Sequence, residues 1–137
     1  MSNIKKYTIT EWNDNTVVFV VDHDKITNES FHALNNFWSD SESRLDDANG
    51  DVVIAVLKMF AEYCLKHQMY HSLNNYGMMS HFGTDDRPHS GVEGYPRMDG
   101  SVGILLVSVD TPEIEIDDDV KTEKVDKMPE PPKPNWG

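Results

Sequence analysis

Two histidines, His67 and His71, have the spacing of a possible metal site. They stand four residues apart, so in a helix both imidazole rings lie on one face, as metal ligands must. No glutamate lies between them, so the general base of a zinc protease is missing. A third ligand would have to come from the loop that follows, where the candidates are His81, His89, Asp85 and Asp86. We favour an ordinary structural or exposed role for the pair, with metal binding as the alternative.

Other residues that could do chemistry have simpler explanations. Asp22, His23 and Asp24 place two carboxylates around an imidazole at a predicted strand end. Neighbours on a strand point to opposite faces, so a turn, a cap or surface charge is favoured over acid–base catalysis. The only cysteine, Cys64, has apolar neighbours that indicate a buried structural thiol. Neither glycine-rich phosphate-binding motif occurs, and we predict no catalytic residue and no cofactor.

The chain is strongly acidic, with a formal net charge of −12 over 137 residues. Such a surface repels nucleic-acid backbones, so direct binding to DNA or RNA is not expected. Residues 22–51 alone contain eight acidic residues against two basic ones. We predict that carboxylates of this stretch bind a basic surface on another protein, and the candidates are Asp22, Asp24, Asp40, Glu42, Asp46 and Asp47.

The composition is that of a soluble protein, with 38% hydrophobic and 26% charged residues. There is no run of about 18 apolar residues, so no transmembrane helix is expected. The first residues lack the apolar core of a signal peptide. We therefore expect a cytoplasmic protein that does not associate with membranes.

Hydrophobic patterns predict the strands. Residues 5–22 indicate a β-hairpin, with an alternating first strand and a valine-rich second strand around an Asn-Asp-Asn turn. Residues 101–109 have the apolar run of a buried strand, and 113–116 would extend the edge of the sheet.

The same patterns predict two helices. The first would begin at its cap Thr27 and end near Ser39, followed by an acidic linker. The central helix would begin after a cap at Asn49 and run at least to Tyr70, with limits as late as residue 76 before Gly77. Glycines and prolines make 77–100 an irregular loop, in which Tyr95-Pro96 and Met98 either pack over the sheet or form a recognition patch.

These elements predict an α+β fold in the order β-β-α-α-β. A small antiparallel sheet, made of the N-terminal hairpin and a late strand, would be covered on one face by two helices. We expect residues 1–116 to form a single domain. Residues 117–137 are charged and rich in proline, which favours a disordered tail.

The stretch DHDKITNESFHALNNFWSDSESRLDDANGDVVIAVLKMFA resembles a family of uncharacterised proteins from bacteriophages, prophages and related bacterial genomes. Its acidic strand end, its threonine-started helix ending in Asn36-Phe37-Trp38 and its acidic linker are similar, as is Glu93-Gly94-Tyr95-Pro96 further on. The resemblance covers most of residues 5–109. It implies a phage-type accessory protein that works in the cytoplasm of a bacterial host, and it provides no catalytic residues.

Three functional hypotheses remain open. The leading one is a non-enzymatic acidic module that binds a host or phage protein acting on nucleic acid, with DNA mimicry or an anti-defence role as its sharper form. The second is a small metal-binding enzyme that uses His67 and His71. The third is a structural homo-oligomer in which Phe37 and Trp38 form the subunit interface.

Overall fold

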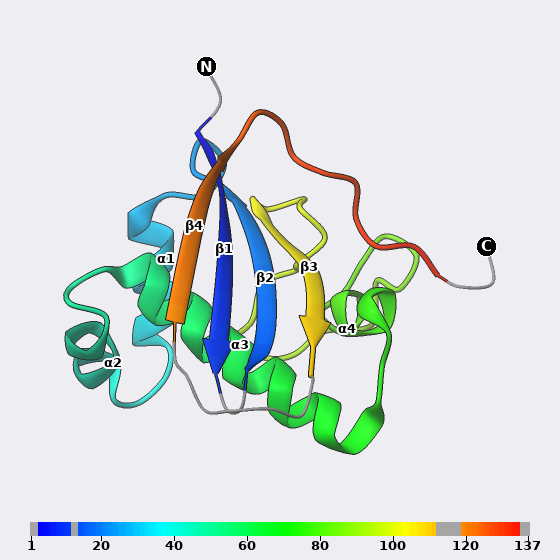
Figure 1. The fold of residues 1–137 in the computed structure, drawn as a ribbon, viewed down its shortest axis with the longest axis horizontal. Coiled ribbons are helices and arrows are strands. Elements are labelled where there is room, and N and C mark those ends of the chain that lie inside the picture. The colour runs from blue at the N-terminus through cyan, green and yellow to red at the C-terminus, as the bar shows by residue number, and fades with distance from the viewer. Residues whose placement is uncertain (1–2, 12–13, 112–118, 135–137) are drawn as a thin grey trace.

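The computed structural model of the chain describes residues 3–11, 14–111 and 119–134. Its elements are β1 (Ile4–Glu11), β2 (Asn15–Asp22), α1 (Asn28–Asn36), α2 (Ser41–Asp47), α3 (Val52–His71), α4 (Asn75–His81), β3 (Ile104–Asp110) and β4 (Asp119–Val125). The strands form one antiparallel sheet in the order β3-β2-β1-β4, and α3 crosses one of its faces (Figure 1). The predicted α+β class is confirmed, and the predicted order holds in outline with α2, α4 and β4 added.

The predicted β1–β2 hairpin is present, and β1 has the alternation that the sequence predicts. Tyr7 and Ile9 of β1 lie opposite Phe19 and Val17 of β2, and all four side chains are buried. Neighbouring positions point to the other face, because side chains alternate along a strand. Asp14 takes a left-handed φ of 65° in the turn, which its short side chain tolerates. Of the other two residues of the predicted turn, Asn15 begins β2, and residue 13 lies outside the described residues.

α3 is the predicted central helix, and Asp51 sets its start. The Asp51 carboxylate accepts hydrogen bonds from the backbone N–H groups of Val53 at 3.0 Å and Ile54 at 3.2 Å. These are two of the donors that a helix leaves unpaired in its first turn. The predicted cap at Asn49 is therefore wrong, and Asn49 instead has a left-handed φ of 55° in the preceding turn.

The end of α3 also differs from the prediction. The helix stops at His71 because Ser72 takes a left-handed φ of 47°. Asn74 then begins α4, and its side-chain oxygen accepts a hydrogen bond from the N–H of Gly77 at 2.7 Å. Gly77 thus lies inside a helix instead of ending one, and the expectation of an irregular 77–100 segment is wrong for its first residues.

α1 begins at Thr27 as predicted, and the Thr27 hydroxyl accepts a hydrogen bond from the N–H of Ser30 at 3.3 Å. The helix ends at Asn36, earlier than predicted. The acidic stretch after it forms α2 and not an irregular linker. Leu45 packs α2 against the core, and α1 packs along α3.

The prediction that 117–137 is a disordered tail is wrong for the residues of β4. β4 pairs with β1, with Thr122 opposite Tyr7, and Met128 just beyond it packs against the core. An edge strand needs only backbone groups that face its neighbour, and charged side chains are typical of sheet edges, so a charged sequence does not exclude one. The predicted edge strand at 113–116 lies outside the described residues.

Among the residues that the structure describes, no helix combines the length and apolarity needed to cross a membrane.

We expect β4 to stabilise the domain. Ending the chain after Thr111 removes the β1–β4 hydrogen bonds, each worth about 0.5–1.5 kcal/mol, and exposes the edge of β1. The free energy of unfolding, measured by urea titration, should fall by about 2 kcal/mol or more. A chain ending after Met128 keeps β4 and should unfold like the full chain. Equal midpoints for the two shortened chains would show that β4 contributes nothing.

Candidate functional site

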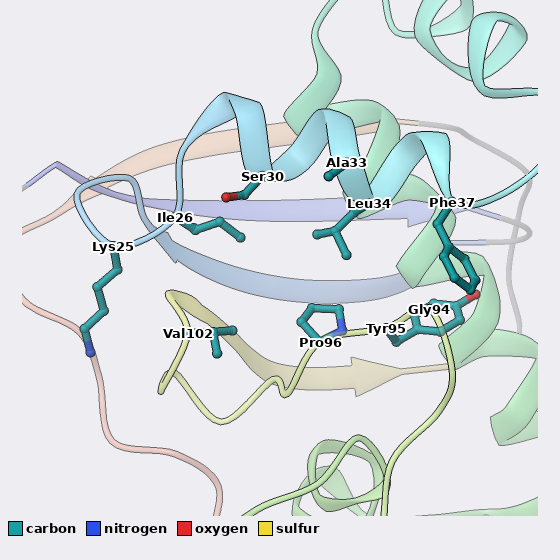
Figure 2. A pocket seen from close by; sticks show the side chains of 10 residues that line it. All are labelled: Lys25, Ile26, Ser30, Ala33, Leu34, Phe37, Gly94, Tyr95, Pro96 and Val102. Atoms are coloured by element: carbon teal, nitrogen blue, oxygen red, sulfur yellow. The ribbon is translucent and has the colours of Figure 1, made fainter.

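An apolar groove opens between α1 and the loop that follows Glu93 (Figure 2). Its volume of about 530 Å³ is within the range of about 300–1,000 Å³ that is typical of ligand pockets. α1 provides one wall and the loop the other, and most of the lining is aliphatic or aromatic. The lining residues are Lys25, Ile26, Ser30, Ala33, Leu34, Phe37, Gly94, Tyr95, Pro96 and Val102.

The spacing of side chains along α1 builds the first wall. Ser30, Ala33, Leu34 and Phe37 recur at intervals of three and four residues, so they share a face of the helix. Phe31 points away from this face and is fully buried in the core. α1 therefore has apolar residues on two faces, and the groove face is the one left at the surface.

Two glycines bring the second wall close to α1. A Cβ added at Gly94, where φ is +86°, would overlap Trp38 and lie 2.6 Å from Cε1 of Phe37. A Cβ added at Gly103, where φ is +106°, would lie 2.8 Å from Cγ2 of Ile26. Only glycine permits both the backbone conformation and the approach. The groove is the space left between these two close contacts.

Tyr95 fixes the loop to the core. Its ring centroid lies 5.1 Å from that of Phe60 and 5.5 Å from that of Trp38. Burial, the largest cause, raises the pKa of Tyr95 to about 12. Met98 is fully buried, and its carbonyl accepts a hydrogen bond from the N–H of Leu106 at 2.9 Å. The loop wall is thus tied both to the aromatic core and to β3.

The sequence pointed to residues of both walls but not to the groove. Of the two alternatives for the loop, packing holds for Met98, which is fully buried, whereas Tyr95 both packs against the core and lines the groove with Pro96. The third hypothesis places Phe37 and Trp38 at a subunit interface and stays untested; Phe37 is 54% exposed, and the ring of Trp38 lies 5.5 Å from that of Tyr95. One signal was available in the sequence, because α1 has apolar residues on a second face besides the face that carries Phe31. Helix periodicity alone does not show whether such a face packs inside the protein or binds another molecule.

The six carboxylates predicted to bind a partner are divided between two elements. One group lies on α2 or at its start and is exposed: Asp40, Glu42, Asp46 and Asp47. The other group stands at the end of β2, where Asp22 Oδ1 accepts a hydrogen bond from the backbone N–H of Asp24 at 3.0 Å. α2 projects from the left side of the fold, whereas β2 ends near the N-terminus (Figure 1).

The only cation of α2 is turned toward the protein. Arg44 donates hydrogen bonds from Nε to Asn35 Oδ1 at 2.8 Å and from Nη2 to the carbonyls of Asn35 at 2.8 Å and Trp38 at 3.2 Å. These carbonyls lie at the C-terminal end of α1, which carries unpaired acceptors and partial negative charge. Within the described part of the chain, no ion pair involves an α2 carboxylate.

The structure brings His67 and His71 together with His81, one of the predicted third ligands. The ring of His67 stacks between the other two, with centroid distances of 4.2 Å to His71 and 4.1 Å to His81. The Tyr63 hydroxyl is hydrogen-bonded to His81 Nε2 at 2.7 Å. Stacked rings turn their faces to one another, and in the described ranges no three His, Cys, Asp or Glu side chains are arranged to hold a metal ion.

The other candidate ligands are not part of this cluster. The three rings share a pocket of about 540 Å³ with Arg87, and neither Asp85, Asp86 nor His89 lines it. Asp85 instead forms an ion pair with Arg97, with an N–O distance of 2.9 Å.

The histidine at the end of β2 bonds to a tyrosine and not to a carboxylate. His23 Nε2 lies 2.8 Å from the hydroxyl of Tyr7. Burial, with the charge of Asp51 second, raises the pKa of Tyr7 to about 12, so the hydroxyl keeps its proton. Burial and then the charge of Lys5 lower the pKa of His23. Cys64 is fully buried as predicted, and burial raises the pKa of its thiol.

The sequence was compared with known families. The model described as "Protein of unknown function (DUF2528)" matches residues 16–125, a range that includes α2, both walls of the groove and β4. The chain belongs to the DUF2528 family. It is 45% identical over 121 residues to Protein ea10 of Escherichia phage lambda and, with the same identity, to the lambda prophage-derived protein ea10 of Escherichia coli O6:H1 strain CFT073. Each alignment covers 88% of this chain and 96% of the relative.

These relatives confirm the resemblance to phage and prophage proteins that the sequence indicates. No solved structure matches this DUF2528 chain.

We expect Gly94 to be essential for the loop wall. Gly94→Ala would strain a left-handed backbone and press a methyl group onto Phe37 and Trp38. The free energy of unfolding, measured by urea titration, should fall by about 1–3 kcal/mol. Gly50→Ala is the matched control, since φ is +83° there and an added Cβ meets nothing within 4 Å. Equal losses in the two variants would show that the ring contacts do not matter.

The histidine stack should make stability depend on pH. Burial and then the charges of His81 and His71 lower the pKa of His67, and burial and His71 lower that of His81. The folded protein thus favours the neutral rings. Their stabilising effect is present above the unfolded pKa of about 6.5 and is lost as pH falls toward the lower folded pKa.

Urea midpoints should therefore fall between about pH 7.5 and pH 5.5, and His67→Gln should reduce that fall. His32→Gln, which removes an exposed histidine of α1, is the control and should leave the pH dependence unchanged. An identical pH dependence in wild type and His67→Gln would contradict the role of the stack.

Proposed function

We propose that this chain is a non-enzymatic, acidic protein-binding module of a phage or prophage. Its exposed α2 carboxylates dock on the basic surface of a host or phage protein that acts on nucleic acid. The acidic surface speeds the encounter with such a partner through long-range attraction.

The orientation of Arg44 carries this proposal. Its guanidinium is held by carbonyls at the end of α1, so it does not reach out to neutralise the carboxylates of its own helix. Asp40, Glu42, Asp46 and Asp47 are exposed, and no ion pair among the described residues neutralises them, although Lys58 of α3 lines a hollow beside Asp47. Because Arg44 is bonded to α1 and does not neutralise the α2 carboxylates, this surface suits a basic partner.

The charge spacing supports the sharper form, DNA mimicry. Residues 40–47 span about 12 Å of helix axis at about 1.5 Å per residue. Four carboxylates over this length give about one charge every 3 Å, close to the spacing of about 3.4 Å between phosphates along one DNA strand. A protein that binds DNA through such phosphates would meet a similar charge density on α2. An anti-defence role would follow where that protein is a host nuclease.

Binding should depend on the α2 carboxylates and weaken with salt. The variant Asp40→Asn, Glu42→Gln, Asp46→Asn, Asp47→Asn keeps the shape of α2 and removes its charge. Wild-type protein immobilised in host lysate should retain basic proteins at about 0.1 M salt and release them toward 1 M, where the Debye length falls from about 10 Å to 3 Å. The α2 variant should not retain them.

A charge-matched control separates a specific surface from general acidity. Neutralising four exposed carboxylates elsewhere, at Asp86, Asp110, Glu123 and Glu130, removes the same charge and should leave retention unchanged. Duplex DNA added to the column should displace the retained proteins. Equal loss of retention in both variants, or binding of a DNA oligonucleotide by the chain itself, would overturn the proposal.

A further inference from the structure

We propose that the groove between α1 and the loop is a docking site for an amphipathic helix of a basic protein, which inserts a bulky apolar side chain between Leu34 and Pro96. The residues that line the groove are enough to make the site apolar. The assignment of a basic partner rests on the proposed function.

Exposed apolar side chains mark the two ends of the groove. Within the described ranges, the exposed large hydrophobic residues are Phe37, Met69, Tyr70 and Val102, and two of them line this site. Phe37 stands at the α2 end of the groove and Val102 toward the other end, with Leu34 and Pro96 between them (Figure 2). Isolated exposed apolar residues need no explanation, but several around one hollow indicate a binding site.

The groove is formed in advance of binding. Gly94 brings the loop against the end of α1, Gly103 brings it against Ile26 before α1, and Tyr95 packs on Phe60 in the core. The walls therefore do not have to be ordered when a ligand enters, which saves the entropy that ordering a flexible loop would cost. A site of this length and shape suits the helix-in-groove mode, in which anchors recur every three or four residues.

Charge decides which occupant fits. Glu29 precedes the groove residue Ser30 on α1, Glu93 precedes Gly94 on the loop, and both glutamates are exposed. These carboxylates suit lysines or arginines beside the apolar anchors of a partner. A second copy of this chain would bring another net charge of −12 to the same face, so self-association is disfavoured.

Lys25 does not conflict with a basic occupant. It stands at the far end of the groove, and its side chain extends away from the apolar residues (Figure 2). The C-terminal end of a helix carries partial negative charge, so Lys25 fixes the direction of a bound helix with its C-terminus at this end.

The test uses the full chain and a defined probe. The probe is a synthetic peptide of leucine and lysine, about 15 residues long, with leucines spaced to form one helix face. A scrambled peptide of the same composition and charge has no such face. Backbone amide shifts in ¹H–¹⁵N spectra locate each peptide. We expect the amphipathic peptide to shift residues 26–37 and 94–102, and the scrambled peptide to shift only α2.

Two variants test whether Phe37 takes part in binding the peptide. Phe37→Ala should weaken binding of the amphipathic peptide about tenfold, a loss within the range for truncating an aromatic side chain that takes part in a contact. Tyr70→Ala removes an aromatic side chain that is 82% exposed on α3, and should leave the affinity unchanged. Both residues are largely exposed, so both variants should fold, and their amide spectra report this directly. Equal affinities for the two variants would overturn the groove assignment.

The same spectra separate this inference from the proposed function. Shifts confined to α2 with both peptides would overturn the groove and leave the acidic surface intact. Groove shifts that persist in the four-fold α2 variant would support the groove even if the lysate experiment fails. Equal binding of a peptide with glutamate in place of lysine would overturn the basic partner. Loss of the groove signals with formation of a dimer in sedimentation would assign the site to a second copy.

Discussion

The packing of α3 on the sheet is the contact on which the rest of the structure depends. Phe60 of α3 meets Phe19 of β2 edge to face, with ring centroids 6.5 Å apart, and both side chains are fully buried. Burying a side chain of this size stabilises a protein by about 1.5–3 kcal/mol. Tyr95 contacts Phe60 with tilted rings, and Trp38 contacts Tyr95 in the same way. One line of aromatic rings thus connects the sheet to the wall of the groove.

This line explains why an irregular loop can form a defined surface. A loop of this length would ordinarily be mobile, because few of its residues make contacts that offset the entropy of ordering it. Here Tyr95 and the buried Met98 supply those contacts. Gly94 allows the backbone to approach the end of α1 and Gly103 allows it to approach Ile26, while Pro96 and Val102 between them line the open groove. The loop is therefore ordered and still presents apolar side chains to solvent.

Hydrogen bonds and burial also decide where charge is exposed on this protein. Arg44 stabilises the corner between α1 and α2 by bonding to the last carbonyls of α1, and in doing so it leaves the acidic side of α2 unneutralised. Where the ends of α3 and α4 meet, burial and neighbouring imidazoles lower the pKa values of His67 and His81 and so disfavour their charged forms. At these two places a cationic group is held against the protein or its charged form is disfavoured. The exposed α2 surface is acidic for a structural reason.

Local sequence patterns determined a large part of the fold. The alternation in β1 and β2, the Thr27 cap and the apolar face of α3 each involve residues close together in the chain, and these elements are confirmed. The helix limits were less accurate, because left-handed turns at Ser72 and Asn49 depend on how the flanking segments pack. The sequence identified the candidate acidic residues, but it did not show which of them lie together in the folded protein.

Tertiary structure alone decided the features that join distant segments. Thr122 pairs with Tyr7, His81 stacks on His67, and the loop around Pro96 faces α1. The charged sequence of β4 reveals no strand, because its partner is the edge of β1 at the other end of the chain. The sequence by itself determined the α+β class, the acidity and the two apolar faces of α1. Which face would stay open depended on where the glycine-rich loop came to rest, and that position is set by packing on Phe60, not by any local pattern.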